Sequence, residues 1–273
     1  MEQQQTISIL GCGWLGLPLA SRLVKKGYIV KGSTQTAEKL SLLHQHKIVP
    51  FLIEVQKKIK GTNLNQFFSS DILIINIPPG RKRKDVARSH PQQINAIIEK
   101  AIQGSTKKVL FISSTSVYGN VNRLVTEADE PQPETNSGIA LVKAESLLVG
   151  TSNFETTILR FGGLVGPNRL AGRFLAGKKD IPNGQAPVNM IHLDDCIHIV
   201  EHIIEQDCWG YLFNACADEH PSRAEFYVSQ ALKQGLEVPE FSSEAIFSYK
   251  EVSNYKLKQQ LSYEFINPDP MKF

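Results

Sequence analysis

The sequence predicts an α/β fold in which a doubly wound parallel sheet carries a small C-terminal lobe. Apolar strands and amphipathic helices alternate from the N-terminus, a glycine-rich turn joins the first strand to the first helix, and a hydroxyl-rich segment closes a buried strand in mid-chain. Continuous apolar strands joined by helices are typical of parallel sheets that are covered on both faces. A chain of 273 residues is long enough for one large domain with a lobe.

The expected strands are short apolar runs, and the expected helices carry apolar residues at helical spacing. The strands are residues 6–10, 28–32, 48–54, 71–76, 108–113 and 156–161. The helices are residues 14–26, 37–44 and 136–148, together with an apolar stripe from Ile94 to Ala101. Pro91 is expected in the first turn of the helix that carries this stripe, where proline is tolerated.

The composition changes beyond residue 161. Residues 162–187 are rich in Gly, Pro, Arg and Lys and predict a long loop. Asp194 or Asp195 is expected to cap a helix, and Ser222 with Glu225 has the spacing of a capping box.

Composition argues against several classes of protein. A formal net charge of +3 is too small to indicate a nucleic-acid or membrane-surface partner. No apolar run reaches the roughly 20 residues of a membrane span, and the N-terminus lacks a signal-peptide pattern. The four cysteines show no metal-ligand spacing. We therefore expect reduced thiols, no metal site and a cytoplasmic location.

Gly11, Gly13 and Gly16 follow the first strand in the spacing Gly-x-Gly-x-x-Gly. Between a strand and a helix, this spacing is typical of Rossmann domains that bind dinucleotides. Gly11 permits the tight turn, Gly13 lets the backbone approach a pyrophosphate, and Gly16 lets helix and strand pack closely. Trp14 and Leu15, which stand between these glycines, are placed among the cofactor-binding residues. The alternative is a glycine-rich turn that binds nothing.

Residues about 20 positions past the second glycine indicate which dinucleotide binds. An NAD-specific domain carries Asp or Glu there for the ribose 2′-hydroxyl. This chain has Gly32-Ser33-Thr34-Gln35-Thr36, with Lys39 one turn on. We place Ser33, Thr34 and Lys39 at a 2′-phosphate, which favours NADP and leaves NAD possible. Thr36 also suits the cap of the next helix, and both roles are compatible.

Two further strand ends face the same edge of the sheet. Glu54 is positioned to accept a hydrogen bond from the adenine amino group, or it is a solvated strand end. Ile77 and Pro78 begin a rigid turn after the fourth strand, and we also place them at the cofactor. The basic run 81–84 either reaches a phosphate or forms a solvated loop.

The segment Ser113-Ser114-Thr115-Ser116-Val117-Tyr118-Gly119 closes the fifth strand at the edge where open α/β sheets bind ligands. With other blocks in the same order, it makes the chain resemble the extended short-chain dehydrogenase/reductases, a group of nucleotide-sugar epimerases, dehydratases and reductases. The other blocks are the glycine turn and residues 127–133, 159–167, 189–195 and 253–257. Leu10 departs from this pattern, because extended members usually have a glycine there.

The resemblance implies a Rossmann-type domain over residues 1–162, to which a strand and a helix return at about 188–215. It implies a small substrate lobe over residues 163–187 and 216–273. Ser114 would hydrogen-bond the reacting oxygen, and Lys143 would hold the nicotinamide ribose. The tyrosine that usually completes the site would fall one helical turn before Lys143, where this chain has Ile139. Isoleucine can neither donate nor accept a proton, so the active site is atypical.

Other side chains are alternatives for chemistry. Tyr118, His192 and His220 each serve either in proton transfer or in a structural role. Arg169 and Arg173 either clamp an anionic substrate or are solvated loop residues.

The sequence therefore favours an NADP-binding oxidoreductase or epimerase-like protein that acts on a small molecule, with a nucleotide-sugar as the implied class. We expect neither nucleic acid nor membrane as a partner, and the apolar helix 136–148 is compatible with a homodimer. One alternative is a non-catalytic NADP-binding sensor or scaffold, because the tyrosine is missing. Another is a 2-hydroxyacid dehydrogenase, against which Ser114 and Lys143 argue.

Overall fold

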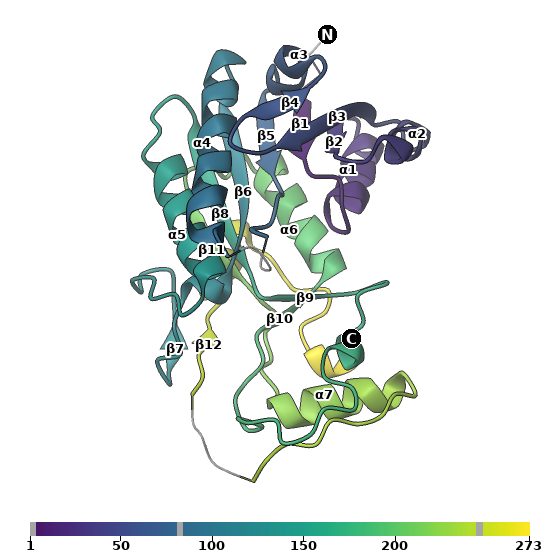
Figure 1. The fold of residues 1–273 in the computed structure, drawn as a ribbon, viewed down its shortest axis with the longest axis vertical. Helices are drawn as coiled ribbons and strands as arrows, with labels where there is room; N and C mark the ends of the chain where they lie inside the picture. The colour runs from purple at the N-terminus through teal and green to yellow at the C-terminus, as the bar shows by residue number, and fades with distance from the viewer. Residues whose placement is uncertain (1–3, 81–83, 244–247) are drawn as a thin grey trace. The chain divides into compact units, whose positions relative to one another are not determined.

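The computed structural model describes residues 4–80, 84–243 and 248–273, and contacts divide the chain into two compact units (Figure 1). Unit 1 consists of Met1–Val117, Pro133–Leu159 and Ile203–Leu212. Unit 2 consists of Tyr118–Gln132, Arg160–His202 and Phe213–Phe273. This division differs from the predicted boundary at residue 162, since residues 118–132 group with the second unit.

The main sheet has eight strands in the order β11-β8-β6-β5-β1-β2-β3-β4. Their bounds are β1 Thr6–Leu10, β2 Ile29–Thr34, β3 Val49–Val55, β4 Ile59–Gly61, β5 Ile72–Ile75, β6 Lys108–Ser114, β8 Glu155–Phe161 and β11 Leu212–Ala215. The pairings among β6, β5, β1, β2 and β3 are parallel, whereas β4 joins β3 as an antiparallel hairpin. All six strands predicted from the apolar runs are present. The short strand β4 was not predicted.

The order of strands reverses at β1, which pairs with β2 on one side and with β5 on the other. In a doubly wound sheet, a crevice for ligands opens at such a reversal, beyond the carboxyl ends of the strands. Apolar residues of β1 and β5 are almost completely buried there, so the two strand ends are held firmly.

The helices of unit 1 follow the strands that they connect. Their bounds are α1 Gly16–Lys25, α2 Leu40–Gln45, α3 Leu64–Phe68, α4 Val86–Gln103 and α5 Asn136–Val149. Helices α4 and α5 lie side by side (Figure 1). The expectation for Pro91 is wrong, because α4 begins at Val86 and Pro91 is its sixth residue. The polar residues before Pro91 hid this first turn from the apolar pattern.

Unit 2 contains two small parallel pairings, of β9 with β10 and of β7 with β12. The bounds of its elements are β7 Leu124–Val125, β9 Gly163–Val165, β10 Met190–His192, α7 Arg223–Lys233, β12 Glu251–Val252 and α8 Tyr255–Leu261. The segment 162–187 is therefore not one uninterrupted loop. Ser222 and Glu225 form the predicted capping box at the start of α7. The helix α6, Leu193–Glu205, passes from unit 2 into unit 1.

The predicted cap of α6 is wrong. This helix begins at Leu193, so Asp194 and Asp195 lie inside its first turn. The buried carboxylate of Asp195 instead accepts hydrogen bonds from the hydroxyl of Tyr263 at 2.8 Å and from the amide of Ile266 at 2.7 Å. The aspartate thus anchors the C-terminal segment of unit 2. Among the described residues, no helix combines the length and the hydropathy needed to cross a membrane.

Candidate functional site

The glycine turn lies at the point where the strand order reverses. Gly11 follows β1 with φ of 108°, and a Cβ atom there would lie 2.6 Å from the carbonyl oxygen of Asn76, which follows β5. A Cβ atom at Gly16 would overlap the carbonyl oxygen of Gly11. The side-chain amide of Asn76 donates to this same oxygen at 2.9 Å. Packing of the turn therefore explains the glycines at positions 11 and 16.

Gly13 differs from its two neighbours. It is exposed, its φ is not positive, and a Cβ atom there would have no described atom within 4 Å. Nothing in the fold of the protein thus requires a glycine at this position. The backbone of the turn leaves open space before the first turn of α1, which contains no acidic residue. A diphosphate fits such a place, because the first amides of a helix lack partners and carry partial positive charge.

The end of β2 supplies buried and exposed polar side chains. Ser33 is buried, and its Oγ accepts a hydrogen bond from the amide of Gly11 at 2.9 Å. Thr34 is also buried, and its Oγ1 accepts from the amide of Thr36 at 3.1 Å. Lys39 and Gln35 are exposed. The two hydroxyls predicted at a 2′-phosphate thus shape the turn itself, while Lys39 and Gln35 extend into solvent.

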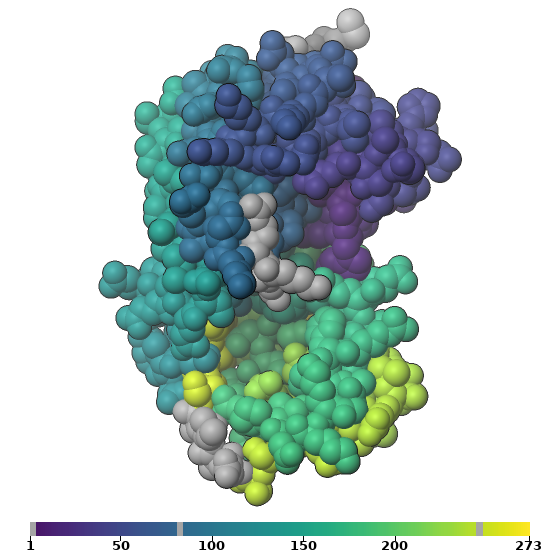
Figure 2. All heavy atoms as spheres, in the orientation of Figure 1, coloured from purple at the N-terminus to yellow at the C-terminus, as the bar shows by residue number. Residues whose placement is uncertain are grey.

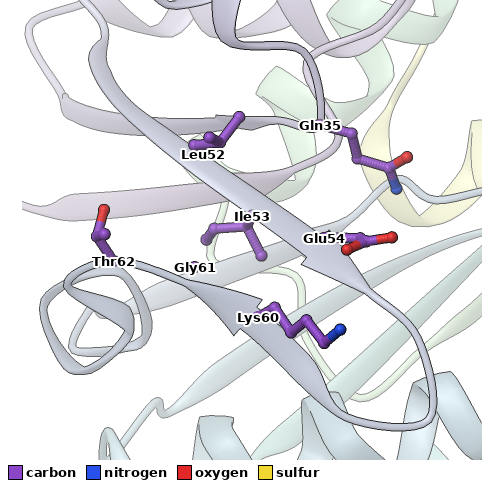
Figure 3. A pocket seen from close by; sticks show the side chains of 7 residues that line it. All are labelled: Gln35, Leu52, Ile53, Glu54, Lys60, Gly61 and Thr62. Carbon is purple, nitrogen blue, oxygen red and sulfur yellow. The ribbon is translucent and has the colours of Figure 1, made fainter.

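The hairpin of β3 and β4 forms a pocket of about 310 Å³ on the surface of unit 1 (Figures 2 and 3). Its lining residues are Gln35, Leu52, Ile53, Glu54, Lys60, Gly61 and Thr62. The polar ends of Gln35, Glu54 and Lys60 lie at one end of this pocket, away from Thr62 (Figure 3). Glu54, predicted at the adenine, accepts a hydrogen bond from Gln56 at 2.5 Å. Sequence reasoning missed Lys60, because the β4 pairing that places it beside Glu54 was not predicted.

A second group of polar residues lies at the carboxyl end of β6. Ser114 is half-buried, and its Oγ accepts from the amide of Ser116 at 3.2 Å. The hydroxyl of the preceding Ser113 donates to Oε1 of Glu145 at 2.5 Å. Glu145 is only 4% exposed, and the sequence gave no reason to expect its carboxylate in this place. A buried carboxylate with a hydroxyl partner joins α5 to β6.

Lys143, predicted to hold the nicotinamide ribose, is exposed on α5. Ile139, one turn earlier, is half-buried. The contact of α5 with the segment after β6 is made instead at Gly138, where a Cβ atom would lie 2.6 Å from the carbonyl oxygen of Ser116. The roles of Ser114 and Lys143 stay predictions.

Tyr118 belongs to a buried polar network of unit 2. Its hydroxyl donates to Oδ1 of Asn214 at 2.9 Å and accepts from Nη1 of Arg160 at 2.7 Å. The amide of Asn214 donates in turn to Glu127 at 2.7 Å. Burial raises the pKa of Tyr118, and the positive charge of Arg160 opposes that rise. A phenol with both hydrogen-bonding functions occupied and only 2% exposed suits a structural role.

The remaining candidates of unit 2 also have partners within that unit. Nδ1 of His220 donates to the carbonyl oxygen of Val188 at 2.9 Å. Nδ1 of His192 lies 3.3 Å from the carboxylate of Asp194. Arg169 donates through Nε to the carbonyl oxygen of Leu164 at 2.8 Å, and Arg173 is exposed. These contacts fit the structural alternatives for the two histidines and for Arg169.

The turn after β5 is described as far as residue 80. Ile77 is half-buried and contributes to the contact with Gly11, while Pro78 is exposed. Residues 81–83 of the basic run lie outside the described residues. Within the described ranges, we find no group of three or more His, Cys, Asp or Glu side chains that could hold a metal ion.

Comparisons with known proteins extend over nearly the whole chain. No protein-family model matches it. The chain is 32% identical over 268 residues to protein YeeZ of Escherichia coli K12, a match that covers 97% of each chain. A conserved protein of unknown function from Silicibacter pomeroyi has a TM-score of 0.79 and 21% identity, over 98% of this chain and 96% of that one. A variant of UDP-glucuronic acid 4-epimerase from Bacillus cereus, in complex with NAD and UDP-4-deoxy-4-fluoro-glucuronic acid, has a TM-score of 0.79 and 19% identity, over 96% and 94% of the two chains.

Proposed function

Because the chain belongs to the same family as protein YeeZ and has the Rossmann-type fold of the NAD-dependent epimerase/dehydratases, we propose that it binds a nicotinamide dinucleotide and acts on a small hydroxyl or carbonyl compound. A bound dinucleotide supplies or accepts the hydride. The protein holds the diphosphate at the glycine turn and the reacting oxygen at Ser114. Nucleotide-sugars are the substrate class that we favour, because the UDP-glucuronic acid 4-epimerase of this fold was solved with a UDP-sugar.

The observation that carries the proposal is the open space at Gly13. Glycine is costly in conformational entropy and needs a reason at each position. The reason at Gly11 and Gly16 is packing, and at Gly13 no packing reason exists. Close approach of a diphosphate to the backbone supplies one, and the N-terminus of α1 supplies unpaired amides to hold it.

We favour NADP because positive charge without a carboxylate partner surrounds the end of β2. Lys39 follows this strand, and Lys60 lines the pocket next to it. Residues 32–37 contain no carboxylate that would repel a 2′-phosphate. Glu54, at the same pocket, is suited to accept a hydrogen bond from an adenine amino group.

The test is a fluorescence titration of the purified protein with NADPH and with NADH. We expect saturable binding of both and tighter binding of NADPH. The loss of absorbance of the reduced dinucleotide is then followed with UDP-sugars and small carbonyl compounds as trial substrates. No binding of either dinucleotide to the folded protein would contradict the proposal.

A second candidate is a non-catalytic dinucleotide sensor. The observation that favours it is Ile139, an aliphatic residue at the position where the resemblance expects a proton donor. Tight binding of NADPH with no turnover of any trial substrate would favour the sensor. Turnover above the rate of the protein-free mixture would exclude it.

A further inference from the structure

The helix α5 contacts the end of β6 through one defined face. Gly138 lies against the carbonyl oxygen of Ser116, so closely that a Cβ atom would come within 2.6 Å. Glu145 lies seven residues later and accepts the hydrogen bond of Ser113 at 2.5 Å. Residues seven apart lie on the same side of a helix, about 20° from alignment. These two contacts therefore fix the rotation of α5 about its axis relative to β6.

This rotation decides which pair of residues one turn apart lies nearer to the end of β6. At about 100° per residue, Leu141 lies about 60° from Gly138, on the side toward Glu145. Lys143 lies about 140° from Gly138, on the opposite side. Burial agrees, since Leu141 is 3% exposed while Lys143 is exposed. The pair at positions 137 and 141 thus lies on the inner side of α5, and the pair at 139 and 143 on the outer side.

We propose that Ser137, rather than residue 139 or 143, is the α5 residue that contacts the nicotinamide ribose of a bound dinucleotide. This inference rests on the proposed function, and it replaces the role given to Lys143. Ser137 begins the inner face of the helix next to Gly138, whose backbone adjoins the hydroxyl-rich end of β6.

The local hydrogen bonds suit a hydroxyl in this role. Thr135 is the N-cap of α5, and its Oγ1 accepts from the amide of Gly138 at 3.1 Å. Oγ1 of Thr135 also lies 3.1 Å from Oγ of Ser137. If Thr135 donates its hydroxyl hydrogen across this contact, the hydrogen of Ser137 is directed elsewhere and suits a ribose oxygen. A ribose hydroxyl both donates and accepts, so serine is a matched partner.

The consequence is that the inner face of α5 holds a ligand without supplying a proton. A serine hydroxyl does not ionise near neutral pH, and Leu141 is apolar. A substitution of tyrosine at position 139 would then add a phenol on the wrong side of the helix.

The test is cysteine footprinting of the full chain. Cys12, Cys196 and Cys216 are buried and Cys208 is partly exposed, so Cys208→Ser provides the background. Ser137→Cys and Ile139→Cys are each made in it, and alkylation by iodoacetamide is timed with and without saturating NADPH. We expect NADPH to slow labelling at position 137 about tenfold or more and at position 139 less than about twofold.

Equal protection at both positions, protection at 139 alone, or no protection at either while NADPH fluorescence reports binding would each overturn the inference. If wild-type protein binds neither NADPH nor NADH, the proposed function fails first, and fluorescence alone reveals that. A second pair of variants covers the case in which a cysteine variant does not fold. Ser137→Ala should weaken NADPH binding about two- to tenfold, the size of one lost hydrogen bond. Ser146→Ala, on the exposed side of α5, is the matched control, and equal affinities of the two variants would contradict the role of Ser137.

Discussion

Single residues of the glycine turn separate structure from ligand binding. Gly11 and Gly16 are enclosed by backbone atoms, whereas Gly13 faces open space. Substitutions at the first two should therefore lower stability, and a substitution at the third should lower affinity alone. Few sites allow the two effects to be separated so cleanly.

We predict that Gly13→Ala binds NADPH about tenfold or more weakly than wild type, because a methyl group would stand where the diphosphate approaches the backbone. Its thermal unfolding should match that of wild type within about 2 °C, since no described atom lies within 4 Å of the added carbon. Gly16→Ala is the comparison and should unfold at a clearly lower temperature. Unchanged affinity in a folded Gly13→Ala protein would argue against the diphosphate site.

The choice between dinucleotides should depend on Lys60. We expect Lys60→Ala to raise the Kd for NADPH about three- to tenfold and to leave the Kd for NADH unchanged, because only NADPH carries the 2′-phosphate. Lys58→Ala, in the exposed turn of the same hairpin, controls for general loss of positive charge. Equal weakening of both dinucleotides would assign Lys60 to another part of the cofactor.

At the scale of elements, the junction of α5 with β6 depends on Glu145. Its carboxylate is buried and accepts from Ser113, so its removal leaves a buried hydroxyl without that partner. We expect Glu145→Ala to lower the free energy of unfolding by about 2–4 kcal/mol. Glu145→Gln retains an acceptor oxygen and should cost about 1 kcal/mol. Urea unfolding measures both, and equal losses would show that the hydrogen bond with Ser113 contributes little.

The loop between β7 and α5 should respond to acid through Asp129. Hydrogen bonds from Arg123 and from the amide of Thr126 hold the pKa of Asp129 at about 2. Because this pKa is lower than in the unfolded chain, the ionised carboxylate stabilises the fold above about pH 4, and that stabilisation disappears as pH falls through about 2. We expect Asp129→Asn to reduce the loss of stability between pH 5 and pH 2, measured by urea unfolding. Glu130→Gln, an exposed neighbour, should reproduce the acid response of wild type.

At the scale of the whole molecule, the sequence predicted the strands of the main sheet and the glycine turn, because local patterns determine them. Apolar runs mark β1 and β5, and Gly-x-Gly-x-x-Gly marks the turn between β1 and α1. The short elements β4, β7 and β12 escaped prediction, since each forms by pairing with a partner strand. Lys60 escaped for the same reason.

The candidate site shows where counting along the chain fails. The interval from Ser114 to residue 139 was taken from a related pattern, but an interval cannot state how a helix is rotated. Gly138 and Glu145 state it, through contacts with Ser116 and Ser113. Ser33 gives a similar lesson, because its hydroxyl is turned toward Gly11 and serves the shape of the turn.

Binding of a nicotinamide dinucleotide at the glycine turn is the claim on which all functional conclusions depend. Isothermal calorimetry with NADPH, on wild type and on Gly13→Ala, measures it most directly. We predict one site per chain for wild type, with heat of binding that is largely lost in the variant. Absence of heat with both NADPH and NADH in folded wild-type protein, or identical isotherms for the two proteins, would contradict it.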